Sequence, residues 1–471
     1  MTEGITALSL TEAARAIGNK KLSSVEVTQA CLARMERLAP VLDCVAQVDP
    51  EQVLAAAAQA DSDLAAGNRR GLLHGVPLAH KDMYYRRGRV SGCGSKIRAD
   101  FVPDQTSTAL SRLDDAGALD IARLNMVEFA LGLTGHNEVM PTPRNPWNTD
   151  YMTGGSSSGS GSAVAAGLVY GAMGSDTGGS IRFPASCCGL VGMKPTYGRV
   201  SRFGAMPLSH SLDTLGPLTR TVTDNAAMLG AIAGPDDEDA TASSLPVPNY
   251  LAGLEDGIKG LRIAVPENIF YDPVDPEVRS LMEDSVEVMR QLGGAIIPVA
   301  IPNSMAAVNG MNNLISMTEG AALHQNWIAE RSQDYGRQTL GRLTTGLCVS
   351  ATRYIQALNL RHKILAEFAE AVFEKADILH VPSMIVPVPT LAESDLSGNP
   401  GFSEFITKMG HCTRPFNYLG LPGLSVPCGF TKSGLPAGMQ LVGRPFDEAT
   451  LYRAARAYER ETEWPNAAPD L

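Results

Sequence analysis

Residues 151–195 read YMTGGSSSGSGSAVAAGLVYGAMGSDTGGSIRFPASCCGLVGMKP and contain two clusters of glycine and serine, at 154–162 and 178–180. The apolar segment between them, residues 162–173, predicts a buried helix, so the clusters do not form a flexible linker. Two Gly–Ser turns around one buried element bring backbone N–H groups and two hydroxyls to one point. Serine acyl transfer requires such an arrangement of a nucleophile, a proton relay and an oxyanion site.

The composition is that of a globular protein with a large core, with 471 residues of which 44% are apolar and 19% are charged. A formal net charge of −11 and the lack of a lysine–arginine block argue against a nucleic-acid-binding surface. Eight cysteines without C-x-x-C spacing predict reduced thiols rather than disulfides or a zinc site. The sequence shows no signal peptide and no run of about 18 apolar residues, so we expect a cytoplasmic protein.

Helix and strand patterns alternate along the chain, which is typical of an α/β layered protein. Ser23 and Glu26 fit a capping box at the start of an amphipathic helix. Further helices are predicted at residues 52–66, 106–118 and 276–292, and strands at 76–79, 119–124, 261–265, 295–299, 378–381 and 423–426. Residues 197–220 carry many turn residues and predict an irregular segment over the core, whereas residues 235–251 predict a connection.

A charged pair, Lys81 and Asp82, follows the apolar run at 76–79. In α/β proteins the end of a buried strand is a common place for chemistry, although a solvated strand end is the more frequent explanation. His80 and Lys81 point to opposite faces of a strand, so we expect His80 to pack or to form a hydrogen bond. No histidine stands near a G-x-S-x-G motif, which leaves an α/β-hydrolase without support.

Three motifs resemble those of the amidase signature family: GVPLAHKD (75–82), GGSSSGSGSA (154–163) and GSDTGGSIRFPA (174–185). They stand in the family's order, and the similarity extends to LPAGMQLVGRPFDE at 435–448. The resemblance implies an α/β fold, with a large mixed β-sheet flanked by helices on both faces, in a single domain over residues 1–471. Within it we expect N-terminal helices (about 1–68), a catalytic core (about 69–234), a connection (about 235–258) and a C-terminal α/β part (about 259–471).

The resemblance also implies roles for residues of these motifs. Ser180 would be the nucleophile that forms an acyl-enzyme, and Lys81 would be the general base, because burial can lower the pKa of a lysine by several units. Ser156, which in the family follows a cis peptide bond, would relay the proton between them. The oxyanion hole would consist of the backbone N–H groups of Thr177, Gly178, Gly179 and Ser180.

Supporting residues and a substrate pocket can be predicted around this centre. Where many family members have glycine, Ser158 extends the serine run, and we expect Ser157 to contribute only hydrogen bonds. Asp176 and Arg182 flank the nucleophile, and a salt bridge that braces the loop is the preferred role. Five apolar or aromatic residues are pocket candidates, with core packing as the alternative for each: Tyr84, Tyr85, Met126, Phe129 and Met152.

The substrate is harder to predict. KPTYGRVSRFG at 194–204 is similar to the A subunits of tRNA-dependent amidotransferases, whose family pattern implies an acid for the amino group of glutamine and an arginine for its carboxylate. Gly410 and Leu365 stand at those places here, although Arg361 lies one turn from Leu365. The loss of both ionic anchors favours a stand-alone amidase for a less polar amide.

That interpretation predicts the hydrolysis of a small-molecule carboxylic acid amide to an acid and an amine or ammonia. No cofactor, metal, nucleic acid or membrane is expected to take part, and a homodimer is left open. The first alternative is the glutaminase subunit of an amidotransferase, which would depend on a partner. The second is a binding protein with a degraded site, which the three filled catalytic positions disfavour.

Overall fold

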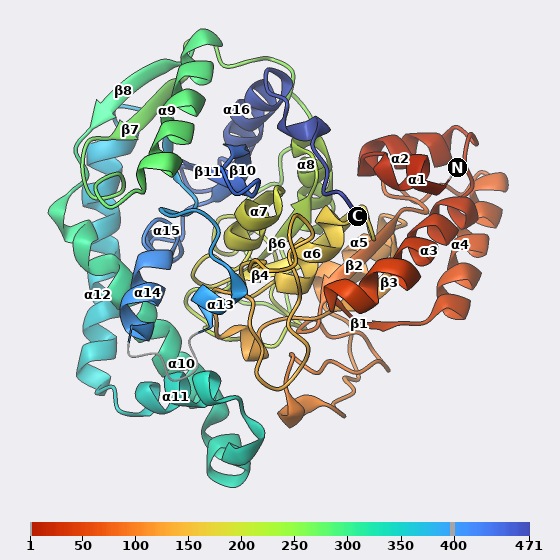
Figure 1. Cartoon of the computed structure of the whole chain (residues 1–471), viewed down its shortest axis with the longest axis horizontal. Coiled ribbons are helices and arrows are strands. Elements are labelled where there is room, and N and C mark those ends of the chain that lie inside the picture. Colours follow the sequence, from red (N-terminus) through yellow and green to blue (C-terminus); the bar gives the residue numbers. More distant parts are fainter. Residues whose placement is uncertain (1, 396–400) are drawn as a thin grey trace.

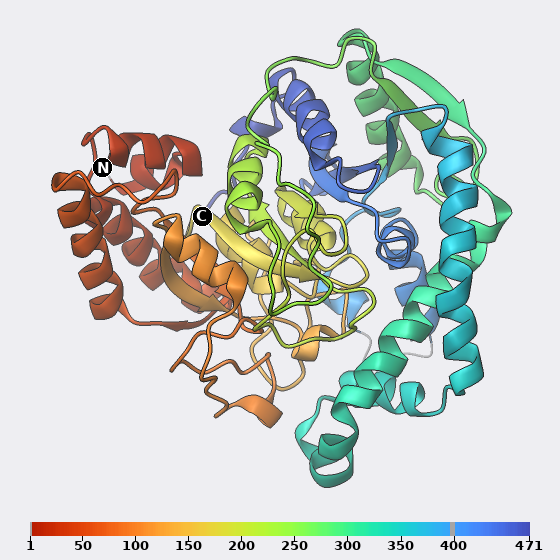
Figure 2. The same ribbon diagram turned by 180° about the vertical axis from the view of Figure 1, so that it is seen from behind.

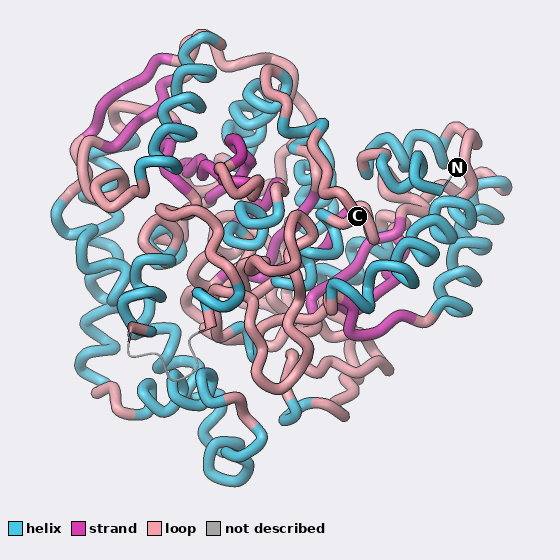
Figure 3. The backbone as a smooth tube through the Cα atoms, viewed as in Figure 1, coloured by secondary structure: helices cyan, strands magenta, loops and turns pink. Residues whose placement is uncertain are grey.

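A mixed β-sheet runs through the interior of the molecule, in a computed structural model that describes residues 2–395 and 401–471. Figure 3 shows the strands passing through the middle of the fold with helices around them. Within the described residues the sheet has eleven strands, in the order β1 (Val45–Val48), β3 (Leu119–Leu124), β2 (Pro77–Lys81), β4 (Gly171–Asp176), β6 (Thr214–Thr219), β5 (Val191–Lys194), β10 (Gly423–Phe430), β11 (Pro436–Gly443), β9 (Ile378–Pro382), β7 (Arg262–Pro266) and β8 (Ala295–Val299).

The strand directions explain how the sheet positions the motifs. Strand β2 is parallel to both of its neighbours, β3 and β4, so these three strands end at the same edge. From β4 through β6, β5, β10, β11 and β9 all pairings are antiparallel, and β9, β7 and β8 are parallel again. The ends of β2 and β4 therefore bring the motif at 75–82 beside the motif at 174–185.

Helices cover both faces of this sheet (Figure 1). Helices α6 and α7 pack together on the central strands, while α8 and α16 pack together on the other face, as the view from behind in Figure 2 shows for α8. The helices are α1 (Thr2–Ala7), α2 (Leu10–Gly18), α3 (Ser24–Leu42), α4 (Pro50–Ala65), α5 (Thr108–Asp115), α6 (Ser158–Ala165), α7 (Arg182–Cys188), α8 (Val222–Ile232), α9 (Pro276–Gln291), α10 (Val308–Arg331), α11 (Arg337–Leu347), α12 (Ala351–Phe368), α13 (Leu391–Ser394), α14 (Phe402–Met409), α15 (Arg414–Tyr418) and α16 (Glu448–Arg460).

Strong local signals correspond to real elements. The capping box is present at the start of α3, where Ser23 and Glu26 exchange hydrogen bonds and Val27, Cys31 and Met35 are buried. The strand predicted at 119–124 is β3, and the helix predicted from Pro276 is α9. The predicted large mixed sheet with helices on both faces, in a single domain, is confirmed. Its division into four parts remains a prediction.

Two sequence predictions fail in the middle of the chain. Residues 162–173 do not form one helix, because α6 begins earlier, within the serine cluster, and β4 already starts at Gly171. Small side chains let α6 pack closely, since a methyl group on Gly159 would lie 2.4 Å from the carbonyl oxygen of Asn125. The supposedly irregular segment 197–220 contains β6, which is buried on both faces and therefore lacks the alternation that predicts a strand.

Within residues 2–395 and 401–471, no helix combines the length and the apolar character needed to cross a bilayer.

Candidate active site

Lys81 is the last residue of β2, and its side chain is completely buried. Its Nζ donates hydrogen bonds to Ser156 Oγ over 2.7 Å and to Ser175 Oγ over 2.8 Å. The preceding residue, His80, pairs with Asp120 instead, over 2.7 Å, as expected for alternate residues of a strand and for a packing role. Lys81 therefore joins a residue of the first serine cluster to a residue of β4.

The environment of Lys81 favours its neutral form. Burial lowers the pKa of the Lys81 ammonium to about 7, against the opposing charges of Asp176 and Asp213. No carboxylate of the described residues forms an ion pair with Lys81, and its closest partners are hydroxyls. A large fraction of Lys81 is therefore unprotonated at neutral pH and able to accept a proton.

Ser156 follows a cis peptide bond after Gly155, the geometry that the family resemblance implies. The backbone around this bond is closely packed, since a methyl group on Gly155 would lie 2.8 Å from the backbone nitrogen of Gly135. Neighbouring loops fix both residues, because Gly155 N donates to Leu133 O over 2.7 Å and Val127 N donates to Ser156 O over 3.1 Å. These contacts hold the Ser156 hydroxyl against Lys81.

Ser180 lies in the loop between β4 and α7, beside the first serine cluster. The backbone N–H of Ser157 donates to Ser180 O over 3.2 Å, which connects the two Gly–Ser clusters directly. Ser180 is 3% exposed, and its hydroxyl has no hydrogen-bond partner among the residues that the structure describes. Its Oγ is thus free to meet a ligand, whereas Ser156 Oγ is already bound to Lys81.

The four backbone N–H groups predicted as an oxyanion hole are not equivalent. Gly179 N donates to Asp176 Oδ1 over 2.7 Å, so this N–H group is not free to bind an oxyanion. Within the described chain, the N–H groups of Thr177, Gly178 and Ser180 have no acceptor. Gly179 is instead required by the backbone, because its φ is 130° and a methyl group there would lie 2.4 Å from Phe183.

Asp176 and Arg182 form a buried ion pair beneath this loop, with both side chains 0% exposed. The Arg182 guanidinium donates through Nε and Nη2 to Asp176, over 3.0 and 2.8 Å, and its remaining donors are satisfied by Gln440, Asn417 and the carbonyl of Thr413. Burial opposes the ionisation of Asp176, but the charge and hydrogen bonds of Arg182 hold the pKa of Asp176 well below its usual range. The pair acts as a fixed brace for the loop.

Ser157 and the pocket candidates occupy packed positions. Ser157 Oγ donates to Ser175 O over 3.3 Å and accepts from Ser175 N over 3.2 Å. The Tyr84 hydroxyl donates to Gly174 O over 2.7 Å inside the core, and Tyr85 packs against Phe101 and Arg98. Phe129 stacks against aromatic side chains of the chain segment 324–335, and Met126 and Met152 are also buried. A substrate-lining role for these five residues remains a prediction.

The structure adds residues that sequence reasoning missed. Ser175 binds Lys81, and its place in β4, next to β2 in the sheet, was the available signal. Asn312 of α10 donates to Thr177 O over 3.2 Å, and Thr413 donates to Gly178 O over 2.8 Å. In the described chain, no three His, Cys, Asp or Glu side chains gather as a metal site would require.

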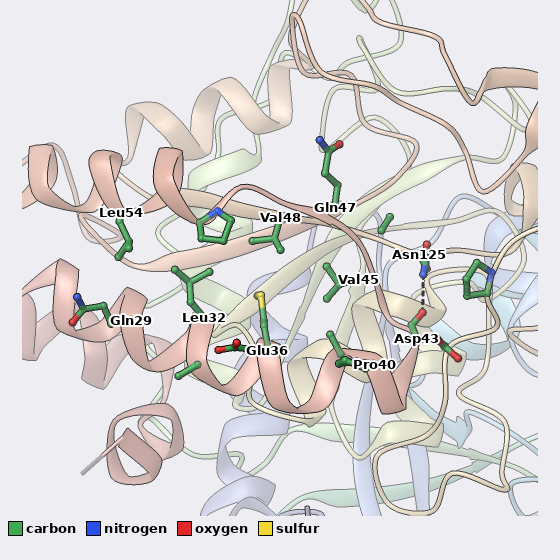
Figure 4. Close-up of a pocket in the computed structure, with 16 residues that line it drawn as sticks. Gln29, Leu32, Glu36, Pro40, Asp43, Val45, Gln47, Val48, Leu54 and Asn125 are labelled. Carbon is green, nitrogen blue, oxygen red and sulfur yellow. Dashed lines mark hydrogen bonds between the residues drawn. The ribbon is translucent and has the colours of Figure 1, made fainter.

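A separate groove lies among the N-terminal elements. It measures about 970 Å³ and runs between α3 and α4 beside β1, the edge strand of the sheet (Figure 4). At one end of it, Asn125 Nδ2 donates to Asp43 O over 2.7 Å. None of Lys81, Ser156 and Ser180 lines this groove, so it is not part of the candidate active site.

Comparison with known proteins places this geometry in a family. A sequence model described as "Amidase" matches residues 26–452. The A subunit of the glutamyl-tRNA(Gln) amidotransferase of Geobacter metallireducens is 39% identical over 468 residues, which cover 94% of this chain and 95% of that protein. The crystal structure of the corresponding A subunit from Thermotoga maritima matches with a TM-score of 0.80 at 31% identity, covering 98% of this chain and 94% of that one.

A further solved structure is described as an unexpected vestigial protein complex that reveals the evolutionary origins of an s-triazine catabolic enzyme. It matches with a TM-score of 0.89 at 31% identity and covers 96% of this chain and 98% of that one. The comparison of structures and the near full-length comparison of sequences therefore lead to the same group of proteins.

These relatives correct the prediction about partners. We expected a chain that acts on a small-molecule amide without a partner subunit or nucleic acid; this prediction is wrong, because the curated relatives are named as one subunit of a glutamyl-tRNA(Gln) amidotransferase. A net charge of −11 describes only the surface of this chain and says nothing about a tRNA held elsewhere in an assembly. The match over residues 26–452 and the relatives show that the chain belongs to the amidase signature family, whose members are enzymes that act on C–N amide bonds.

Proposed function

We propose that the chain hydrolyses a carboxylic acid amide through an acyl-enzyme on Ser180, with Lys81 as the base and Ser156 as the relay. The observation that carries this proposal is the contact of a completely buried Lys81 with Ser156 Oγ over 2.7 Å. An amine that is desolvated and bound to a hydroxyl can take its proton, which an exposed ammonium cannot do at neutral pH.

The proposed proton transfers run from Ser180 through Ser156 to Lys81, and the Lys81–Ser156 hydrogen bond supports the last of them. Neutral Lys81 takes the proton of Ser156 while Ser156 takes the proton of Ser180, and Ser180 Oγ bonds to the amide carbon. The carbonyl electrons move onto oxygen, where each N–H donor of the loop contributes about 3 kcal/mol to the transition state. As the C–N bond breaks, the proton returns through Ser156 to the leaving nitrogen. Water then attacks the acyl-enzyme by the same relay and releases the acid.

The oxyanion would be held by three donors rather than four. Thr177, Gly178 and Ser180 offer N–H groups without acceptors among the described residues, while the N–H of Gly179 stays with Asp176. The ion pair of Asp176 and Arg182 keeps these donors in place without reorganisation, which is the condition for strong electrostatic stabilisation.

For the natural substrate, we propose two candidates, and the first is the primary amide of glutamine, cleaved by this chain as the A-type subunit of an amidotransferase. The near full-length similarity to proteins of that name supports this role. A second candidate is an amidase for a different amide, and one observation favours it. Arg414 occupies the space beside Gly410, where a methyl group would lie 2.7 Å from Arg414 Nε, and this positive charge disfavours the ammonium group of glutamine.

Intact-mass spectrometry of protein quenched during turnover, followed by peptide mapping, tests the chemistry. With glutamine or a small amide as substrate, wild-type protein should carry the acyl mass on the peptide that contains Ser180, and Ser180→Ala should carry none. An adduct that persists in Ser180→Ala would refute the proposed nucleophile.

Ammonia release tests the role within an amidotransferase. Addition of the other subunits of a glutamyl-tRNA(Gln) amidotransferase, with glutamyl-tRNA, should increase ammonia release from glutamine by this chain. Unchanged release from glutamine, together with turnover of another amide, would favour the second candidate.

A further inference from the structure

Arg414 is a buried arginine beside the loop that carries the nucleophile. It is the first residue of α15, and its side chain runs along Gly178, two positions before Ser180. A methyl group on Gly178 would lie 3.2 Å from Arg414 Cγ and 3.6 Å from Arg414 Nε. The side chain also covers Gly410, at the end of α14. The guanidinium thus lies next to one of the backbone donors proposed for the oxyanion.

The hydrogen bonds of Arg414 are incomplete. The residue is only 3% exposed, and Nη1 donates to Asn309 Oδ1 over 2.9 Å. Neither Nε nor Nη2 has a partner in the chain as described, and no described carboxylate forms an ion pair with this guanidinium. Arg182, which follows Ser180 by two positions and is also buried, has every N–H group satisfied. A buried charge without an anion is costly, so the contrast indicates a position that a ligand completes.

A second cation lies near the first. Arg342 is a half-buried residue of α11, and it has no hydrogen bond or ion pair with any residue that the structure describes. Burial, together with the charge of Arg342, lowers the pKa of the Arg414 guanidinium to about 9, and burial lowers the pKa of Arg342 to about 10. Both groups remain cationic at neutral pH, and neither has an anionic partner among the described residues.

We propose that Arg414, assisted by Arg342, binds a carboxylate of the substrate, so that the enzyme prefers amides that carry a free acid group on the acyl chain. This inference rests on the proposed amide hydrolysis at Ser180. A guanidinium with two free N–H groups suits a carboxylate, which accepts two parallel hydrogen bonds. An ammonium near the two arginines would be repelled. The preferred substrate class is therefore the monoamide of a dicarboxylic acid, and the inference deepens the second candidate of the proposed function, an amidase for an amide other than glutamine.

Steady-state kinetics of ammonia release can compare three kinds of amide. The acid arm uses malonamate, succinamate and glutaramate, the neutral arm uses their counterparts propionamide, butyramide and valeramide, and glutamine is the zwitterion. We expect at least one monoamide to exceed its neutral counterpart in kcat/KM by about 30-fold or more, and glutaramate to exceed glutamine. Equal kcat/KM values for acid and neutral amides would overturn the proposal.

Variants assign the preference to the arginines. Arg414→Met should lower kcat/KM for the preferred monoamide by about 30-fold, mainly through KM, and leave that for the neutral amide within about threefold. Arg342→Met, at a half-buried position that tolerates change, should act in the same direction with a smaller effect. Arg337→Met is the matched control, because Arg337 lies in the same helix with its side chain 84% exposed, and it should change neither value. Equal losses for acid and neutral amides would also contradict the proposal.

A binding measurement separates this inference from the proposed chemistry. Calorimetry measures the binding of glutarate to the Ser180→Ala protein and needs no turnover. In this protein, the further change Arg414→Met should weaken glutarate binding at least tenfold, and Arg337→Met should leave it unchanged. If no amide is turned over but glutarate binding depends on Arg414, the proposed reaction fails and the anion site stands. If amides are hydrolysed and Arg414→Met leaves glutarate binding unchanged, the proposed anion site fails and the proposed reaction stands.

Discussion

Lys81 and Lys194 are both completely buried lysines at the ends of strands, β2 and β5 respectively. Burial lowers the pKa of each ammonium to about 7, for Lys194 with help from the charge of Arg182. Their contacts differ, because Lys81 Nζ binds the hydroxyls of Ser156 and Ser175 whereas Lys194 Nζ donates to the carbonyl of the adjacent Pro195 over 3.0 Å. A shifted pKa thus indicates burial, and the atoms in contact determine whether a lysine can act as a base.

Removing the amine of Lys81 should have the largest effect. We expect Lys81→Met to lower kcat by about 10⁴-fold, because the relay loses its only base. The melting temperature should stay within a few degrees of wild type, since a methionine fills similar space without a desolvated charge. Ammonia release and thermal unfolding, measured on the same samples, check both statements. Activity within tenfold of wild type would remove Lys81 from the mechanism.

Removing the second hydroxyl in contact with Lys81 should have an intermediate effect. Ser175→Ala deletes an acceptor that stabilises the ammonium form, so the pKa of Lys81 should fall further. The rate at pH 8 should drop by about tenfold because Lys81 is less well oriented, and the acid limb of the pH–rate profile should move to lower pH. A limb that moves to higher pH would show that Ser175 acts differently.

Removing Lys194 should have the smallest effect and serves as the matched control. Lys194→Met is expected to keep kcat/KM within about threefold of wild type, with an unchanged acid limb, because Lys194 contacts no reacting group. Circular dichroism and unfolding should confirm that the variant is folded. A folded Lys194→Met protein without activity would break the distinction between the two lysines.

Sequence signals predicted elements that are defined locally. The capping box of Ser23 and Glu26 and the short, mostly apolar run at residues 119–124 correctly predicted α3 and β3, since both depend on neighbours in the chain. The central strand β6 was missed because both of its faces are buried and its sequence, TLGPLT, contains glycine and proline. Its role depends on β4 and β5, which are distant in sequence.

The candidate active site also has some features that the sequence predicted and others that depend on residues distant in the chain. Motif resemblance located Lys81, Ser156 and Ser180, and the structure brings Lys81 and Ser156 into contact across 75 positions of the chain. The involvement of the Gly179 N–H group with Asp176 could not be read from the sequence, because it depends on the path of the loop. Arg414 was also not recognised, because its significance lies in the absence of an anionic partner among the described residues.

The pH dependence of kcat/KM for amide hydrolysis tests the central claim that neutral Lys81 starts the reaction. Because the pKa of Lys81 is about 7, protonation below that pH removes the base, so the rate should fall tenfold per pH unit below about pH 7 and level off above it. The Lys194→Met protein should give the same curve. A rate that is independent of pH from 5.5 to about 8.5, or one that falls as pH rises through 7, would contradict the account.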